Sequence, residues 1–196
     1  MSKVVAIEHL TLDGVMQGPG RPDEDRRDGF EYGGWAAAAN DPAMQKVTGA
    51  RMGSSWSLLV GRTTYEDFAS FWPNQPQPNP FTEALNNVEK FVASTTLTEP
   101  LPWQNSTLLK GDADAVAKLK KDHDKTLVTF GSGVLVQSLM RRDLIDEYVL
   151  QIHPLVLGKG RRLFPDDSSL TNFSLVDSVT TGTGVIIATY RPASER

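Results

Sequence analysis

The chain contains no cysteine, only three histidines and no long hydrophobic run. Without cysteine it has no disulfide, no thiolate metal ligand and no cysteine nucleophile. The histidines, His9, His123 and His153, lie far apart in no metal-ligand spacing, so we expect no metal site and interpret them as structural or exposed. The apolar residues 4–7 end at Glu8, unlike a signal peptide, and no stretch approaches the roughly 18 apolar residues of a membrane span. We therefore expect a cytoplasmic protein with no membrane partner.

The chain also lacks a large excess of either charge, because its 20 Lys and Arg residues nearly balance its 24 Asp and Glu residues. The formal net charge of -4 does not suggest the concentrated basic face that nucleic acid requires, so we expect no nucleic-acid partner. A hydrophobic content of 39% over 196 residues is enough for an ordinary core. These values predict one domain over residues 1–196.

Apolar strand patterns alternate with capped helix patterns along most of the chain. This alternation predicts an α/β fold with a mainly parallel sheet, helices on both faces and an antiparallel C-terminal edge. The first predicted strand opens with residues 4–7 and ends at the turn 11–14. The others are 57–60, 90–94, 106–110, 126–130, 146–153, and two late ones near 173–176 and 184–190. The predicted helices start at Asn40 or Asp41, Thr63 or Thr64, Asp112, and Val134.

Two segments interrupt this pattern. Residues 17–35 are rich in Gly, Pro, Asp and Arg, with aromatic residues between them, and read either as a functional loop or as a solvated insertion. Residues 73–80 carry four prolines in eight positions, which predicts an irregular loop.

Two glycine-led turns, 61–64 and 131–133, each follow a predicted strand and open a predicted helix. Glycine lets a ligand approach the backbone, and a helix start offers free N–H groups to a phosphate. Arg62 adds a cation to the first turn. Either turn alone is explained as well by packing, but two on neighbouring parallel strands favour a dinucleotide, because ligands gather at the carboxyl ends of strands.

Two polar residues end other predicted strands and are candidates for the 2′-phosphate of an NADP-type cofactor. Ser94 ends the predicted strand 90–94, and Lys110 ends the next strand. The alternatives are that Ser94 begins a turn and that Lys110 is an exposed edge cation.

Six motifs together resemble the dihydrofolate-reductase-like proteins grouped with the C-terminal reductase domain of the bifunctional riboflavin-biosynthesis deaminase-reductase. The motifs, in chain order, are Thr11-Leu12-Asp13-Gly14-Val15, Leu59 to Glu66, Phe71-Trp72-Pro73, Gly131 to Leu135, Leu144 to Glu147, and Pro154 to Gly160. The resemblance implies the three-layer dihydrofolate-reductase-like fold, an NADPH cofactor, and hydride transfer to a C=N or C=O bond of a pterin-like, folate-like or flavin-precursor-like substrate. It implies cofactor contacts at Arg62, Thr63, Thr64, Ser94, Gly131, Ser132 and Gly133. The further cofactor candidates are Gly61, Val134 and Leu135, which belong to the same two turns, and Lys110 at its strand end.

The chain also departs from dihydrofolate reductases. Those enzymes have adjacent glycines joined by a cis peptide at the second turn, whereas Gly131 is followed by Ser132 here, so no cis bond is expected. Their carboxylate on the first helix has its nearest counterpart in Asp41, with Asp13 as the rival, although Asp13 is equally a turn residue.

The expected substrate pocket lies at the end of the first strand, the 17–35 segment and the first helix, and its candidate contacts are Thr11, Tyr32 and Trp35. Because no proton donor is obvious, an NADP-binding sensor or sequestering protein without turnover is the alternative function. A homodimer is a further prediction, because the late strands can pair or pack across a twofold axis.

Overall fold

The computed structural model describes residues 1–76 and 79–193, and these fall into two compact units. Unit 1 comprises Met1–Val4 and Met52–Leu144, and unit 2 comprises Val5–Arg51 and the chain from Ile145 onward. The expectation of a single domain over 1–196 stays a prediction.

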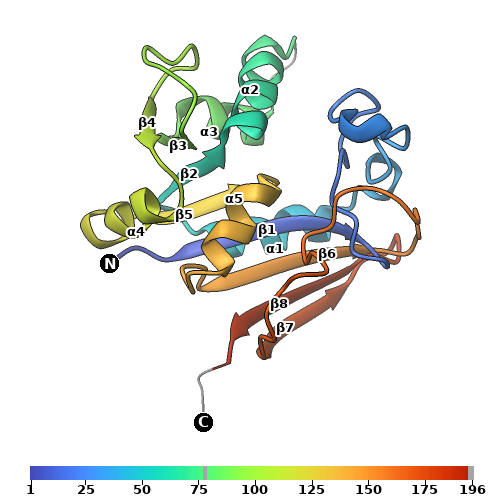
Figure 1. Cartoon of the computed structure of the whole chain (residues 1–196). Helices are drawn as coiled ribbons and strands as arrows, with labels where there is room; N and C mark the ends of the chain where they lie inside the picture. The colour runs from blue at the N-terminus through green and yellow to red at the C-terminus, as the bar shows by residue number, and fades with distance from the viewer. Residues whose placement is uncertain (77–78, 194–196) are drawn as a thin grey trace. The chain divides into compact units, whose positions relative to one another are not determined.

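Unit 1 contains four parallel strands: β2 (Trp56–Gly61), β3 (Lys90–Ser94), β4 (Ser106–Lys110) and β5 (Thr126–Phe130). Their order in the sheet is β4-β3-β2-β5, and each neighbouring pair is parallel. The chain therefore steps outward from β2 to β4 and then returns to the other side of β2 as β5 (Figure 1). In open parallel sheets such a reversal of strand order marks the usual place for a ligand.

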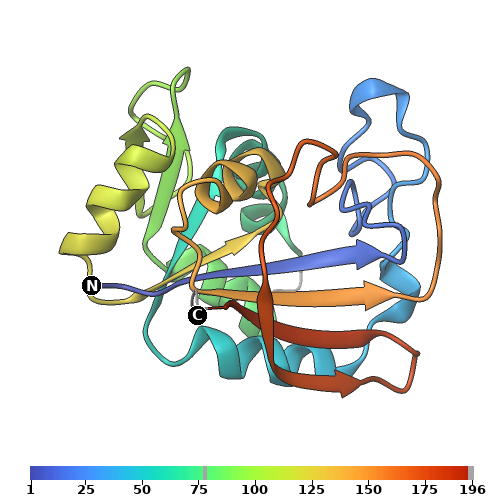
Figure 2. The same cartoon turned by 60° about the horizontal axis from the view of Figure 1, so that its bottom comes forward.

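Helices cover the sheet of unit 1, and one face holds a compact hydrophobic cluster. The helices are α2 (Arg62–Phe71), α3 (Pro80–Asn87), α4 (Ala113–Asp122) and α5 (Gly133–Met140), and α4 contacts α5 (Figure 2). The cluster is formed by side chains of β2 and β3 with residues of α2, α3 and the loop after β3, namely Leu58, Val60, Tyr65, Leu85, Val92 and Trp103. The packing of α2 here fixes the position of the first glycine-led turn, since α2 begins one residue after Gly61.

The sequence correctly predicts three strands of unit 1 at both ends but misses α3. The prediction of an irregular loop over 73–80 is wrong at both of its ends. A 3-10 helix occupies Trp72–Asn74, and α3 begins at Pro80; residues 77–78 of the predicted loop lie outside the described residues. The Asn79 side chain accepts the Thr82 N–H at 2.9 Å, so Asn-Pro here is an N-cap followed by a proline in the first helical turn.

Unit 2 contains β1 (Val4–Thr11, from Val5 onward), β6 (Glu147–His153), β7 (Phe173–Thr180) and β8 (Ile186–Pro192), in the order β1-β6-β8-β7. β1 and β6 are parallel, whereas β6–β8 and β8–β7 are antiparallel, as Figures 1 and 2 show. These pairings confirm the prediction of parallel strands with an antiparallel C-terminal edge. The late strands extend further toward the C-terminus than the sequence predicts, because their ladder continues past the apolar runs that mark them.

The first helix, α1 (Pro42–Met52), is held against β6 by polar contacts. The Asp41 carboxylate accepts the Ala43 N–H at 2.8 Å and so caps the helix as predicted. Gln151 on β6 donates to the Thr48 hydroxyl at 3.4 Å, which places α1 on the face of β6 that carries Gln151.

The 17–35 segment is anchored to the rest of unit 2 and is not a loosely attached insertion. The Trp35 indole N–H donates to the Gln17 carbonyl at 2.7 Å, and the buried Gln17 side chain accepts the Arg161 N–H at 3.0 Å. Gly160 lies against this segment at φ +126°, where an added Cβ would come within 2.9 Å of the Phe30 ring. Two 3-10 helices, Arg27–Gly29 and Ala37–Ala39, lie in and just after the segment. In the described part of the chain, no helix is long and apolar enough to cross a membrane.

Candidate cofactor and substrate sites

The two glycine-led turns, which the sequence predicts as phosphate sites, are hydrogen-bonded to each other in unit 1. The Gly61 N–H donates to the Ser132 hydroxyl at 3.1 Å, and the Ser132 N–H donates to the Thr64 hydroxyl at 3.0 Å. The two turns stand at the carboxyl ends of β2 and β5, where the strand order reverses. They therefore form one feature, and the hydroxyls of Thr64 and Ser132 hold it together.

The second turn has an unusual backbone. Gly131 and Ser132 both lie in the left-handed region, at φ of 60° and 56°. Glycine adopts this conformation freely, whereas serine does so at a cost that is tolerated where the surroundings impose it. Among residues 1–76 and 79–193 the only cis peptide is Glu99–Pro100, so the Gly131–Ser132 bond is trans, as the sequence comparison with dihydrofolate reductases predicts.

Both helices that follow these turns start without a side-chain cap. At the start of α5 the N–H groups of Gly133, Val134 and Leu135 have no hydrogen-bond acceptor within the described residues. Val134 beside them is 68% exposed, although it is apolar. Free N–H groups with the positive end of a helix dipole favour an anion, so this helix start fits a phosphate group.

Arg62 opens α2 next to the first turn and is half exposed. Its guanidinium lies 3.4 Å from the Glu66 carboxylate one helical turn further along. Exposed pairs of this kind contribute little to stability, so Arg62 can exchange Glu66 for a phosphate at small cost. Thr63, between Arg62 and Thr64, is exposed.

Ser94 and Lys110, the two candidates for the 2′-phosphate, are directly opposite each other on β3 and β4. Ser94 is buried, and its hydroxyl accepts the N–H groups of Thr96 and Leu97, each at 3.1 Å. It therefore begins a turn, which was the structural alternative, and its Oγ also lies 3.4 Å from the Thr96 hydroxyl. Lys110 is exposed. The parallel register brings both to the edge of unit 1 that also carries Gly61, which pairs with Ala93.

In unit 2 the carboxylate of Asp13, one of the two predicted proton donors, is fully engaged. It accepts the Thr11 hydroxyl at 2.6 Å, the Gly158 N–H at 2.8 Å and the Leu157 N–H at 3.2 Å. The hydrogen bond from Thr11 and those two backbone bonds lower the pKa of Asp13, which keeps it ionised. Asp13 thus clamps the segment after β6 to the end of β1.

Asp41, the other predicted donor, is engaged in the same way. One oxygen accepts the Ala43 N–H at 2.8 Å, and the other accepts the Gly182 N–H at 3.0 Å. The carboxylate therefore joins the start of α1 to the turn between β7 and β8. The catalytic assignment of both aspartates stays a prediction.

A pair of histidines that sequence reasoning set aside is brought together in unit 2. Nδ1 of His9 on β1 lies 2.9 Å from Nε2 of His153 on β6. His153 is fully buried and His9 is half-buried, and the Trp35 ring packs edge-on against His153 with centroids 5.2 Å apart. Burial, and then the charge of His153, lower the pKa of His9 to about 4, and burial also lowers the pKa of His153. The pair is therefore neutral at pH 7.

The predicted substrate residues divide around this pair. Thr11 lies directly opposite His153 in the β1–β6 register, and Trp35 touches His153. Tyr32 is 46% exposed and packs instead against Phe30, with the Lys159 ammonium 5.0 Å from its ring. The structure thus joins two of the three predicted residues to the histidine pair. Each histidine lies late in a predicted strand, and this is the one sign of the pair in the sequence. The sequence does not show which strands are neighbours, so it could not bring the two together.

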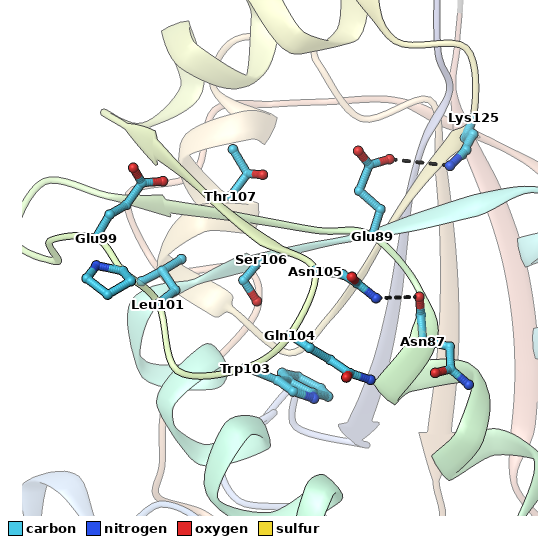
Figure 3. Close-up of a pocket in the computed structure, with 11 residues that line it drawn as sticks. Asn87, Glu89, Glu99, Leu101, Trp103, Gln104, Asn105, Ser106, Thr107 and Lys125 are labelled. Atoms are coloured by element: carbon cyan, nitrogen blue, oxygen red, sulfur yellow. Dashed lines mark hydrogen bonds and ion pairs between the residues drawn. The ribbon is translucent and has the colours of Figure 1, made fainter.

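A surface hollow of about 880 Å³ lies elsewhere on unit 1, at the amino ends of β3, β4 and β5 (Figure 3). Its polar lining includes Glu89, which pairs with Lys125 at 3.4 Å. Near the hollow, the Ser57 hydroxyl lies 3.0 Å from Nε2 of His123. Ser57 is fully buried and its hydroxyl donates to the Glu89 carboxylate, so this pair is not arranged as a serine nucleophile with its base. The hollow is at the edge opposite the glycine-led turns. Among the described residues there is no group of three His, Asp or Glu side chains that could hold a metal ion.

The chain is similar in sequence to proteins of one family. The family model of the RibD C-terminal domain matches residues 2–187. The uncharacterised protein YyaP of Bacillus subtilis is 30% identical over 139 residues, which cover 68% of this chain and 72% of YyaP. YwjB of the same organism, also uncharacterised, is 26% identical over 120 residues, which cover 61% of this chain and 64% of YwjB.

Solved structures show the same fold. A putative riboflavin biosynthesis protein from Shewanella sp. PV-4 superposes with a TM-score of 0.67 at 24% identity, covering 98% of this chain and 99% of its own. A pyrimidine reductase-like protein from Corynebacterium diphtheriae gives 0.64 at 13% identity, covering 99% and 93%. Dihydrofolate reductase from Enterococcus faecalis, solved in complex with NADP(H), gives 0.60 at 17% identity, covering 98% and 97%. The fold is therefore dihydrofolate-reductase-like, and the chain belongs to the RibD C-terminal domain family.

Proposed function

We propose that this protein is an NADPH-dependent reductase that transfers hydride to a C=N or C=O bond of a small heterocyclic substrate of the pterin, folate or flavin-precursor kind. One observation carries the proposal: two uncapped helix starts are bonded to each other at the carboxyl ends of β2 and β5. Two adjacent anion sites suit the pyrophosphate of a dinucleotide. Membership of a reductase family supports the same conclusion.

The residues of unit 1 have distinct parts in holding this cofactor. The N–H groups of Gly133, Val134 and Leu135 donate hydrogen bonds to phosphate oxygens of the cofactor. The exposed Val134 side chain offers the cofactor an apolar contact. Arg62 supplies a cation, and Ser94 and Lys110 supply donors toward the 2′-phosphate. NADPH, when bound, supplies the hydride, and the protein positions the reactants and excludes water.

Isothermal titration with NADPH and NADH tests the cofactor assignment. We expect Arg62→Ala to weaken NADPH binding by about tenfold, the effect of losing roughly 1.4 kcal/mol from a charge-assisted hydrogen bond, and to weaken NADH binding less. Glu66→Gln is the matched control: it removes the competing carboxylate of the Arg62 pair, so NADPH binding should stay equal or become tighter. Equal losses for both cofactors in Arg62→Ala would show that Arg62 does not read the 2′-phosphate. Absence of binding of either cofactor to the wild type would refute the proposal.

A second candidate function is an NADP-binding protein without turnover, such as a sensor or sequestering protein. The observation that favours it is that Asp13 and Asp41, the predicted proton donors, use both carboxylate oxygens to accept hydrogen bonds. Absorbance at the NADPH band, followed with pterins, folates and flavin precursors, separates the two functions. Cofactor binding without oxidation by any of them would favour the second.

A further inference from the structure

The serine of the second glycine-led turn has a backbone conformation that serine disfavours. Ser132 lies at φ 56° and ψ 40°, in the left-handed region, where dihydrofolate reductases have the second of two adjacent glycines. Glycine would adopt this conformation freely. A residue that is held in a disfavoured conformation points to a function of that residue. The contacts of the Ser132 side chain show what a glycine would lose here.

Those contacts join the second turn to the first, within unit 1. The Ser132 hydroxyl oxygen accepts the Gly61 N–H at 3.1 Å, and the Ser132 N–H donates to the Thr64 hydroxyl oxygen at 3.0 Å. Gly61 is the residue before α2, Thr64 lies in the first turn of α2, and Ser132 is the residue before α5. These two bonds, the cross-turn bonds, therefore hold the start of α5 directly against the start of α2.

A ligand can reach the residues that make the cross-turn bonds. Thr64 and Ser132 are half-buried, and Val134, two residues further along, is 68% exposed. Each hydroxyl oxygen accepts one backbone N–H, and neither hydroxyl hydrogen has an acceptor among the described residues. Each hydroxyl can therefore donate to a phosphate oxygen while it accepts the N–H of the opposite turn.

We propose that Thr64 and Ser132 are positioning residues of the cofactor site, and that the cross-turn bonds make the starts of α2 and α5 bind one pyrophosphate group together. This inference rests on the proposed NADPH-dependent function. Without these bonds the two helix starts would be ordered only when the cofactor binds, and the cost of that ordering lowers the affinity. The pyrophosphate is common to NADPH and NADH, so the cross-turn bonds favour both cofactors equally, whereas Arg62 favours NADPH.

The cross-turn bonds themselves are tested without any cofactor. Amide hydrogen exchange of the full chain, followed by NMR, should be slow at the N–H groups of Gly61 and Ser132 in the wild type. Ser132→Gly should speed exchange at Gly61, and Thr64→Val should speed exchange at Ser132. Fast exchange at both groups in the wild type would show that the bonds do not form and would overturn the inference.

Isothermal titration with NADPH and NADH measures what the cross-turn bonds contribute to binding. Ser132→Gly relieves the left-handed backbone while it removes the bond from Gly61, so we expect a midpoint of urea unfolding close to that of the wild type. Its affinity for both cofactors should nevertheless fall about tenfold, the effect of losing one hydrogen bond. A merely structural role for Ser132 would leave affinity unchanged where stability is unchanged. Wild-type affinity in Ser132→Gly therefore overturns the inference.

Variants of Thr64 test the same inference from the other side. Thr64→Val removes the hydroxyl that accepts the Ser132 N–H and should lower the affinity for both cofactors about tenfold, whereas Thr64→Ser keeps the hydroxyl and should recover it. The double variant Thr64→Val/Ser132→Gly should lose less than the product of the two single losses, because both changes act on one pair of bonds. No recovery in Thr64→Ser, or a loss confined to NADPH, overturns the inference.

Asn79→Ala is the matched control for stability in unit 1. It removes the side-chain cap of α3, away from both turns, so it should lower the midpoint of urea unfolding and leave both cofactor affinities unchanged. Losses of affinity in this control equal to those in Thr64→Val would show that affinity merely follows stability, which also overturns the inference. Absence of binding of either cofactor to the wild type, with slow exchange at Gly61 and Ser132, overturns the proposed function instead.

Discussion

Acid should destabilise this protein through His9 in a defined pH window. The pKa of His9 is lowered from 6.5 to about 4 in the folded protein, first by burial and second by the charge of His153. Above pH 6.5 the ring is neutral in both the folded and unfolded chain, so it has no effect. Below pH 6.5 the unfolded chain binds the proton first, and stability falls until about pH 4, where the folded ring is also protonated.

The size of the effect follows from the shift. Each pKa unit corresponds to about 1.4 kcal/mol, so at pH 4.5 the protonation of His9 should remove about 2.5 kcal/mol from the free energy of unfolding. Burial lowers the pKa of His153 as well, and its protonation acts in the same direction. Several kcal/mol is a large part of the stability of an ordinary domain.

Urea unfolding followed by tryptophan fluorescence at pH 7.5 and pH 4.5 measures this loss. Carboxylates also titrate over this range, so the comparison is between wild type and His9→Gln, which cannot take up the proton. We expect the variant to lose less stability on acidification by about 2.5 kcal/mol. Thr48→Val, a nearby change without a titratable group, should keep the wild-type pH dependence. Equal pH dependence in wild type and His9→Gln would refute the reasoning.

The remaining predictions concern the turns, a buried lysine and an edge strand. Ser132→Ala removes the acceptor of the Gly61 N–H and should cost about 1 kcal/mol in urea unfolding and weaken NADPH binding. Gly61→Ala should cost little, because the nearest atom to its Cβ would be Leu135 Cβ at 3.6 Å, an ordinary van der Waals contact. Gly131→Ala at φ +60° should cost about 1–2 kcal/mol from backbone conformation alone, since the nearest atom to its Cβ is 3.6 Å away; an unchanged unfolding midpoint would contradict this. Lys90→Met should destabilise by about 3 kcal/mol, because the buried Lys90 ammonium donates to the carbonyls of Asn86, Val88 and Gln104, and a loss below 1 kcal/mol would show that water replaces it. If β7 mediates the predicted homodimer through its exposed Leu175 (57%), Leu175→Glu should convert a dimer to a monomer in analytical ultracentrifugation, and a persisting dimer would place the interface elsewhere.

The sequence by itself determined most elements of unit 1, α3 excepted, and the positions of its two glycine-led turns. The strands at 90–94, 106–110 and 126–130 were predictable because short apolar runs bounded by turn residues are local signals. The turns at Gly61 and Gly131 were predictable for the same reason, since a glycine between a strand and a helix is also local. Asn79-Pro80 was a local signal too, but the surrounding prolines concealed it.

Tertiary structure alone decided which residues face one another. The bonds from Gly61 to Ser132 and from Ser132 to Thr64 join positions about 70 residues apart, and they depend on β5 returning to the side of β2. The contact of His9 with His153 spans 144 residues and depends on β1 and β6 being parallel neighbours in one register. Register comes from packing and not from local pattern, because shifting a strand by one residue turns every side chain to the other face. The family resemblance pointed to Asp13 and Asp41 as proton donors, and only the folded chain showed both carboxylates engaged and the histidine pair beside Trp35.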